Sequence, residues 1–345
     1  MIPIQNIYYM LSYAFQVLNE QGYKNIATEQ FNNTGELMAA ILEKGIAIQL
    51  KRGLGKEYIL QTEALSSLRG KIDIAESIKT QSTLRKQLIC TYDEFSVNSI
   101  MNRIIKSTVE LLLRSNISKQ RKKNLRKLMV YFSEVDFIDL YTVNWNVQYN
   151  RNNQTYHMLI SICYLVVKGL LQTQSNGHTE LMDFLDEQRM CRLYEKFILE
   201  YYRKEFKNQF TANASQIPWQ LDNEENSMLP VMQSDIMLQS GEKVLIIDAK
   251  YYEHSTQVQF DKHTLHSGNL YQIFTYVKNK EYELREKDHT VSGMLLYAKT
   301  DEEIYPNNVY QMSGNQITVR TLDLNLPFDE IAGQLNTIAK THFDL

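Results

Sequence analysis

The stretch at 232–252 constrains the fold more than any other part of this sequence. Two strand-like runs flank the tetrapeptide SGEK at 240–243, and a glycine at the first central position is typical of a two-residue type II′ turn. Such a turn pairs Ser240 with Lys243, and this pair determines all the remaining residue pairs of the hairpin. The run VLII at 244–247 is apolar on both faces, so we expect a strand buried inside a covered sheet.

The inferred register brings three charged side chains together. Asp235 falls opposite Asp248, and Lys250 leaves the same face as Asp248 because the two are two residues apart. Opposed carboxylates destabilise a strand pair, and a divalent cation removes that conflict. An Asp-Ala-Lys sequence is also common at solvated strand ends. The buried run before it favours a metal site, where the lysine orients or deprotonates a water or stabilises charge on a phosphoryl oxygen.

Two predicted helices add polar residues to this group. Gln272 and Tyr276 are four residues apart, hence on one face of a helix predicted over 267–280. Glu195 lies in a helix predicted over 186–208. Each of them alone is most simply a surface or capping residue. Together with the aspartates and the lysine they form an ordered pattern of Glu, Asp, Asp-x-Lys and Gln-x-x-x-Tyr.

Periodicity predicts an α/β domain in the second half, with helices flanking a mixed sheet. The expected order is helix, three strands, helix, three strands, helix, at 186–208, 215–221, 228–239, 243–251, 267–280, 291–299, 306–312, 315–322 and 328–341. The first half indicates an α+β domain. Its helices are expected at 7–18, 34–48, 98–114 and 156–172, and its strands within 46–75.

The charge distribution divides the chain in the same way. Residues 1–180 carry 21 basic and 15 acidic side chains, whereas 181–345 carry 16 and 25, so a net charge of −3 combines halves of opposite sign. The polar segment 172–179 lies where the sign changes. We therefore predict two domains, 1–175 and 180–345.

A basic run, KQRKKNLRK, occupies 119–127. Three interpretations stay open: a solvated helix face, a surface that binds phosphates, and a surface that docks onto an acidic partner.

Other features exclude several classes of protein. Cys90, Cys163 and Cys191 are odd in number and far apart, which argues against a disulfide framework and a cysteine-ligated zinc site. No GxxxxGK[ST] phosphate loop is present, so any nucleotide hydrolysis would belong to another chain. The first 23 residues lack Lys and Arg, and no apolar run has the length of a membrane span. We therefore expect a cytoplasmic protein without a membrane partner.

The charged pattern resembles the PD-(D/E)xK nuclease superfamily, specifically its branch with a Gln-x-x-x-Tyr helix. The resemblance implies that Asp235 and Asp248 bind a metal and that Lys250 is the catalytic lysine of phosphodiester hydrolysis. A proline often precedes the first aspartate in that superfamily, and Ser234 stands there instead.

The same resemblance assigns roles to the helical residues. Glu195 would assist the metal site, and Gln272 and Tyr276 would position DNA or the metal-bound site. The expected cofactor is Mg²⁺, with Mn²⁺ as an open alternative.

Five separated motifs resemble the McrC family, the nuclease subunits of McrBC modification-dependent (type IV) restriction systems. They are IPIQNIYYML at 2–11, LRGKID at 68–73, NRIIKST at 102–108, IDAKYY at 247–252 and NLYQ at 269–272.

The family resemblance implies a division of labour. The partner would be McrB, a hexameric AAA+ GTPase ring that reads 5-methylcytosine and binds the GTP, while this chain binds no nucleotide alone. Domain 1–175 would insert into the ring and stimulate GTP hydrolysis. Domain 180–345 would cut methylated double-stranded DNA.

Two other functions remain as hypotheses. The chain could be a non-catalytic assembly factor that activates a GTPase ring and has a degenerate nuclease fold, although the intact Asp…Asp-x-Lys set disfavours this. It could also be a nuclease that acts alone on branched DNA, which the acidic second half disfavours.

Overall fold

The computed structural model describes residues 2–15, 18, 23, 26, 29–150, 153, 155–173, 187–222, 228–252, 257–259, 262–299 and 305–345. The chain forms two compact units, one of Met1–Gln30 with Leu185–Leu345 and one of Phe31–Phe184. This division differs from consecutive domains at 1–175 and 180–345, because the first thirty residues join the other unit. The predicted junction at 172–179 lies outside the described residues from 174 onward.

Aromatic packing attaches the N-terminal helix to the unit that contains the C-terminal half. The elements concerned are α1 (Ile4–Ala14), α7 (Glu187–Glu205) and α9 (Phe328–Phe343). Tyr9 of α1 stacks on Phe328 of α9 with ring centroids 4.4 Å apart, and Tyr13 meets Tyr201 of α7 at 5.2 Å. The Asn6 amide donates to two backbone carbonyls just before α9, each at 2.8 Å.

Helices form the core of unit 31–184. They are α2 (Thr34–Arg52), α4 (Ile100–Arg114), α5 (Lys119–Met129) and α6 (Tyr156–Thr173), with short helices α3 (Ile74–Lys79), η3 (Ser82–Arg85) and η4 (Val130–Phe132). The Asn33 side chain caps α2, and Gly53, with φ of +89°, follows its last turn. The strand predicted from residue 46 was therefore wrong as far as 52, because the buried face of α2 continues there. No helix in the described parts of either unit is long and apolar enough to cross a bilayer.

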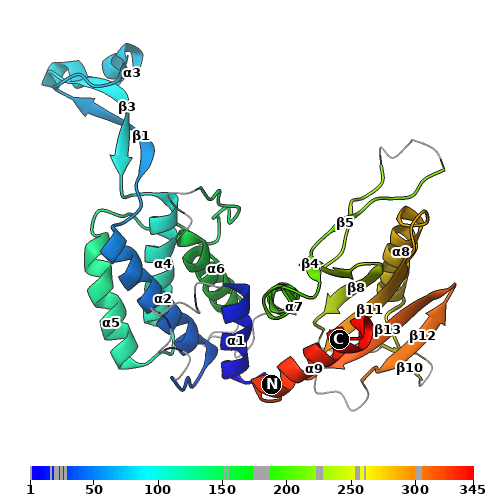
Figure 1. Cartoon of the computed structure of the whole chain (residues 1–345). Coiled ribbons are helices and arrows are strands. Elements are labelled where there is room, and N and C mark those ends of the chain that lie inside the picture. The colour runs from blue at the N-terminus through cyan, green and yellow to red at the C-terminus, as the bar shows by residue number, and fades with distance from the viewer. Residues whose placement is uncertain are drawn as a thin grey trace. The chain divides into compact units, whose positions relative to one another are not determined.

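A small antiparallel sheet projects from this unit and forms what we call the arm, residues 57–96 (Figure 1). Its strands are β1 (Glu57–Leu65), β2 (Lys71–Asp73) and β3 (Leu88–Ser96), in the order β1-β3-β2. Large apolar side chains are exposed along it, at Tyr58, Leu60, Leu68, Ile74, Ile78, Leu84 and Phe95. Gly70 has φ of +65°, and a Cβ there would lie 2.3 Å from the carbonyl oxygen of Thr91, so only glycine fits this turn.

A mixed sheet, as predicted, forms the centre of the other unit, and it has six strands (Figure 1). Its order is β12-β13-β11-β8-β7-β4, and β8, β11 and β13 are parallel while the other pairs are antiparallel. The strands are β4 (Thr211–Asn213), β7 (Ile236–Ser240), β8 (Lys243–Lys250), β11 (Thr290–Ala298), β12 (Asn308–Met312) and β13 (Asn315–Leu322). Two-stranded pairs lie outside it: β5 (Gln216–Ile217) with β6 (Met232–Gln233), and β9 (Gln257–Gln259) with β10 (Lys262–Thr264).

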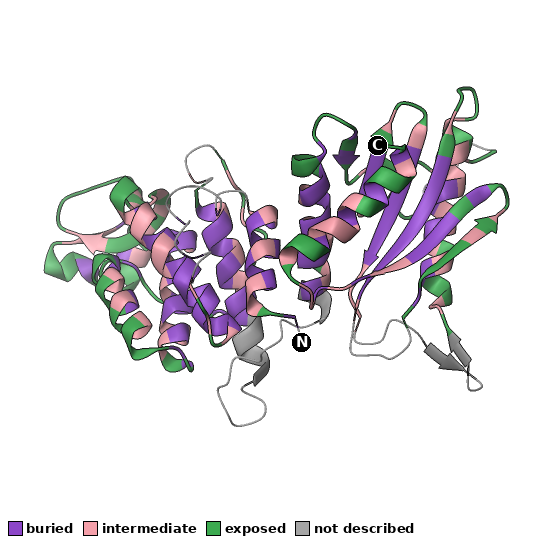
Figure 2. Cartoon of the chain, turned by 60° about the horizontal axis from the view of Figure 1, so that its bottom comes forward, coloured by how far each residue is buried: buried purple, intermediate pink, exposed green. Residues whose placement is uncertain are grey.

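Helices cover the sheet, whose central strands are buried along their length (Figure 2). Val244 and Ile246 of β8 belong to a core that includes Ile273 and Val277 of α8 (Ser267–Glu283). Gly293 of β11 allows α8 to approach closely, since a Cβ there would lie 2.8 Å from both of those α8 side chains. The alternate residues of β8 are equally buried, and α7 and α9 also contact the sheet, so β8 is covered on both faces.

Candidate active site

The hairpin of β7 and β8 has the register that the sequence predicted. Ser240 pairs with Lys243 and Ile236 pairs with Ile247. Asp235 immediately precedes β7, so one further step along the ladder places it opposite Asp248. Gly241 in the turn has φ of +56°, which glycine adopts without strain. The predicted register of the hairpin is thus confirmed, and its extension by one residue sets the two aspartates opposite each other.

Both carboxylates are held in a dry environment. Asp248 is 1% exposed, and Asp235 Oδ2 accepts a hydrogen bond from the Ala249 amide at 2.9 Å. Burial raises the pKa of Asp248 from 3.8 to about 7; the Lys250 ammonium opposes this rise, and the Asp235 carboxylate adds to it. Burial also raises the pKa of Asp235, against the charge of Lys250. Each carboxylate therefore lacks the solvation that its charge requires.

Lys250 connects the carboxylates to α8. Its Nζ lies 2.8 Å from Asp248 Oδ2 and donates to Gln272 Oε1 at 3.2 Å. Gln272 Nε2 in turn donates to the Tyr276 hydroxyl at 2.9 Å. Burial alone would lower the pKa of Lys250, but its ion pair with Asp248 and the charge of Asp235 outweigh burial and raise it. The lysine is therefore a fixed cation in this arrangement.

Glu195 approaches the same group from α7. Burial raises its pKa, the carboxylate of Asp235 raises it further, and Lys250 lowers it. These mutual influences show that Glu195 shares the local field of the aspartates and the lysine. The structure thus brings together all six residues singled out from the sequence.

Neighbouring polar contacts had not been predicted. Cys191 Sγ donates to Glu195 Oε1 at 3.0 Å, and their spacing of four residues on a helix was the available signal. Asn269 Nδ2 donates to the hydroxyl of Tyr297, at 2.9 Å, and Tyr297 pairs with Lys250 across β11 and β8. Asn269 lies three residues before Gln272 and hence near the same helix face, whereas nothing in the sequence pointed to Tyr297.

The carboxylate pair fits a divalent cation. Among the residues that the structure describes, neither buried side-chain oxygen of Asp248 has a hydrogen-bond partner, although Lys250 Nζ forms an ion pair with Oδ2. Among the described residues, no three His, Cys, Asp or Glu side chains form a complete metal-binding group. Mg²⁺ is commonly held by only one or two carboxylates, with water and substrate phosphate as its other ligands. Asp235 and Asp248 satisfy that requirement.

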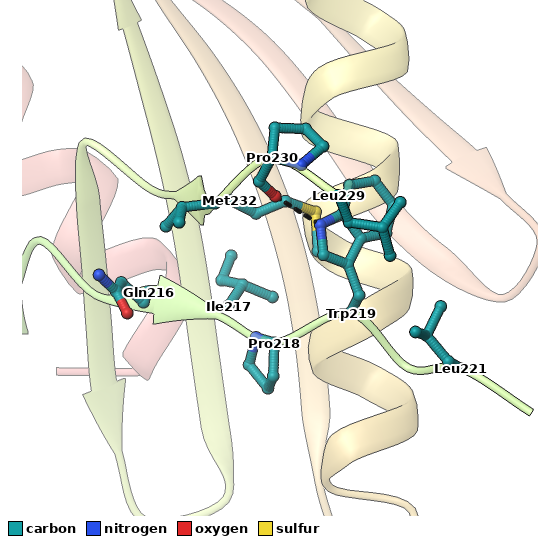
Figure 3. Close-up of a pocket in the computed structure, with 9 residues that line it drawn as sticks. Gln216, Ile217, Pro218, Trp219, Leu221, Leu229, Pro230 and Met232 are labelled. Atoms are coloured by element: carbon teal, nitrogen blue, oxygen red, sulfur yellow. Dashed lines mark hydrogen bonds between the residues drawn. The ribbon is translucent and has the colours of Figure 1, made fainter. Parts of the chain in front are cut away.

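A separate pocket of about 390 Å³, lined mainly by apolar residues, lies beside β5 and β6 and the residues that flank them in the connection between these strands (Figure 3). Its lining consists of Gln216, Ile217, Pro218, Trp219, Leu221, Leu229, Pro230, Val231 and Met232. Trp219 Nε1 donates a hydrogen bond to the Pro230 carbonyl at 2.7 Å, which joins the residue chain after β5 to the residue chain before β6. The pocket has no charged lining residue, so it is distinct from the carboxylate site.

Comparisons with known proteins agree with one another. A family model described as "McrBC 5-methylcytosine restriction system component" matches residues 5–298. The Escherichia coli (strain K12) protein "Type IV methyl-directed restriction enzyme EcoKMcrBC" is 30% identical over 329 residues, which cover 94% of this chain and 93% of that relative.

Two solved structures from Thermococcus gammatolerans are also similar. One is a refined half-complex from a tetradecameric assembly of McrB AAA+ hexamers with bound McrC, with a TM-score of 0.48, 18% identity and coverage of 97% of this chain and 76% of that chain. The other is the McrBC complex determined by cryo-EM, with a TM-score of 0.42, 22% identity and 59% coverage of each chain.

Proposed function

Because this chain belongs to the McrBC family of 5-methylcytosine restriction components, we propose that it is the endonuclease subunit of a GTP-dependent restriction complex. In this proposal its sheet-containing unit is a PD-(D/E)xK nuclease that hydrolyses phosphodiester bonds of methylated double-stranded DNA with Mg²⁺ or Mn²⁺. The observation that carries the proposal is the convergence of Asp235, Asp248 and Lys250 at the end of a buried strand, where neither oxygen of Asp248 has a hydrogen-bond partner among the described residues.

Asp235 and Asp248 would hold the cation, and Glu195 would assist from α7. A bound divalent cation supplies Lewis acidity at a phosphoryl oxygen and lowers the pKa of its water. The protein contributes a dry, shaped site, because burial strengthens every electrostatic interaction there. The Ala249 amide fixes the Asp235 carboxylate, so the geometry is set before DNA binds.

Lys250 would stabilise the negative charge that develops on the phosphoryl group. Its raised pKa keeps it protonated, which favours this electrostatic role over that of a general base. Gln272 holds the ammonium through its carbonyl oxygen, and Tyr276 accepts from the Gln272 amide. These two residues would therefore position the lysine relative to the scissile phosphate.

The partner in this proposal is an McrB-like hexameric AAA+ GTPase. The family name joins two components, and this sequence has no phosphate loop of its own. Unit 31–184 would dock onto the ring and stimulate GTP hydrolysis through the arm, because exposed apolar side chains on a projecting element mark an interaction surface.

Plasmid cleavage by the complex tests the catalytic proposal. The variant Asp248→Asn should assemble with the GTPase and support GTP hydrolysis but fail to cut methylated DNA. Glu242→Gln is the matched control, since this exposed carboxylate lies in the turn of the same hairpin and should leave cleavage unchanged. If the wild-type chain stimulates GTP hydrolysis and never cuts, the non-catalytic assembly factor is the better description.

A further inference from the structure

The outer face of α5 is a concentrated patch of positive charge. We call it the basic face, and it consists of Lys119, Lys122, Lys123, Arg126 and Lys127. None of these side chains forms an ion pair or hydrogen bond with any residue that the structure describes. The helix contains no acidic residue. The patch extends about 12 Å along the helix axis, from a rise of about 1.5 Å per residue.

Helix stability does not account for this arrangement. Lys119 and Lys123, Lys122 and Arg126, and Lys123 and Lys127 are like-charge pairs four residues apart, which destabilise a helix. Cations in the first turn also face the positive end of the helix dipole, whereas Arg126 and Lys127 in the last turn are favoured by its negative end. The repulsion among the like-charge pairs is therefore the unfavourable part of this face, and a polyanion would relieve it.

The acidic residues near α5 are already engaged on its inner side. Glu43 accepts from Arg121 and Asn124, each at 2.9 Å, and Glu36 pairs with Arg121 at 3.6 Å. Arg121 is thus structural, since it ties α5 to α2. The cations of the basic face receive no charge compensation from these glutamates.

We infer that the basic face binds the phosphate backbone of double-stranded DNA. This inference rests on the proposed function, which makes DNA the substrate, and adds a site that holds it without reading its sequence. Counterion release drives such binding and requires only clustered cations. The sheet-containing unit has a long stretch without cations before and within the first strand of the hairpin: no Lys or Arg occurs between Lys207 and Lys243.

The chemistry of the patch favours DNA over an acidic protein. Protein interfaces have apolar or aromatic cores and are depleted in lysine. The exposed residues of α5 are polar or cationic throughout, and its one fully buried side chain, Leu125, points into the unit. Within α5 itself the face therefore has no apolar anchor for a protein partner; the exposed Val130 and Tyr131 follow the helix immediately.

Binding of a short unmethylated duplex to the full chain, in chelator and without the GTPase, tests the inference. Fluorescence anisotropy is measured across a range of salt concentrations. The test variant carries Lys123→Gln, Arg126→Gln and Lys127→Gln. The matched control removes three other exposed cations of the same unit, with Lys51→Gln, Arg52→Gln and Lys56→Gln.

The test variant should bind at least about tenfold more weakly than the control at moderate salt. Its plot of log K against log salt should be shallower by about 0.9 for each phosphate that the variant no longer neutralises. Equal affinity and slope for the two variants would overturn the inference. Failure to assemble with the GTPase, together with unchanged DNA binding, would also overturn it and would assign the face to an acidic protein.

An acetylation footprint of the wild-type chain tests the same inference without any variant, so misfolding of a variant cannot affect its result. The duplex should protect Lys119, Lys123 and Lys127 from acetylation, while Lys51 stays reactive; equal reactivity of all four would contradict the inference. Neither measurement involves cleavage. A chain that binds DNA through α5 and never cuts would refute the proposed nuclease activity and leave this surface intact.

Discussion

Replacing Asp248 by asparagine should stabilise the protein at the same time as it removes the proposed activity. The carboxylate is buried, has no hydrogen-bond partner in the described part of the chain, and lies 2.8 Å from the Lys250 ammonium. The pKa of this acid is higher in the folded protein than in the unfolded chain. As the pH rises from the unfolded pKa to the folded pKa, the unfolded chain loses its proton first, so the free energy of unfolding falls. For Asp248 that window runs from 3.8 to about 7.

The size of the effect follows from the same two values. They differ by about three, and each unit of pKa corresponds to about 1.4 kcal/mol, so the ionised carboxylate costs at most roughly 4 kcal/mol at pH 8. Asparagine is similar in size and never ionises. Asp248→Asn should therefore be more stable than the wild type above pH 7, by up to that amount, and the difference should vanish near pH 4.

Hydrogen exchange of the β8 amides at pH 5 and pH 8, in chelator, measures the opening free energy of this strand. Added Mg²⁺ should slow exchange in the wild type and in the control Glu242→Gln, but not in Asp248→Asn, because a bound cation compensates the carboxylate. A lower opening free energy for Asp248→Asn than for the wild type at pH 8 would contradict the cost assigned to the ionised carboxylate. Equal protection of both proteins by Mg²⁺ would contradict metal binding by Asp248.

Three further changes have defined outcomes. Lys250→Gln should lower the cleavage rate in single-turnover assays by a factor of about 10²–10³, because one preorganised donor is lost. DNA binding should be retained. A cleavage rate within about threefold of the wild type would show that Lys250 takes no part in the chemistry. Gly70→Val should distort the arm, since its Cβ would overlap the Thr91 carbonyl, and abolish co-elution with the GTPase; Gly268→Val, in open space, is the control. Burial, aided by the charge of Lys243, lowers the pKa of His342, so the unfolded chain takes up a proton first and stability falls as the pH drops below 6.5. Urea denaturation of His342→Gln at pH 7.5 and 5.5 should show a smaller loss than the wild type.

The hairpin of β7 and β8 could be predicted because local rules determine it. A two-residue turn at Gly241 sets the register, and the alternation of side chains along a strand then places Asp235, Asp248 and Lys250. The proximity of Lys250 and Gln272 could also be predicted, because the helix with Gln272 follows the hairpin closely in sequence.

Other parts depended on contacts that sequence spacing does not reveal. β3 was not predicted, although its sequence LICTYDEFS carries the apolar, β-branched and aromatic residues typical of a strand; its partner in the sheet is the distant β1. Tyr297 reaches the site through the parallel pairing of β11 with β8, which spans a long segment of chain. The placement of α1 depends on partners in α7 and α9, so no local pattern could assign it to that unit.

That placement of α1 affects how the protein is made. During synthesis α1 leaves the ribosome long before its stacking partner Phe328. Unit 31–184 can assemble from contacts within its own segment, while the unit with the carboxylates cannot close until α9 has emerged. A nascent chain would thus present the arm, which we propose docks onto the ring, before the unit proposed to cut DNA could close.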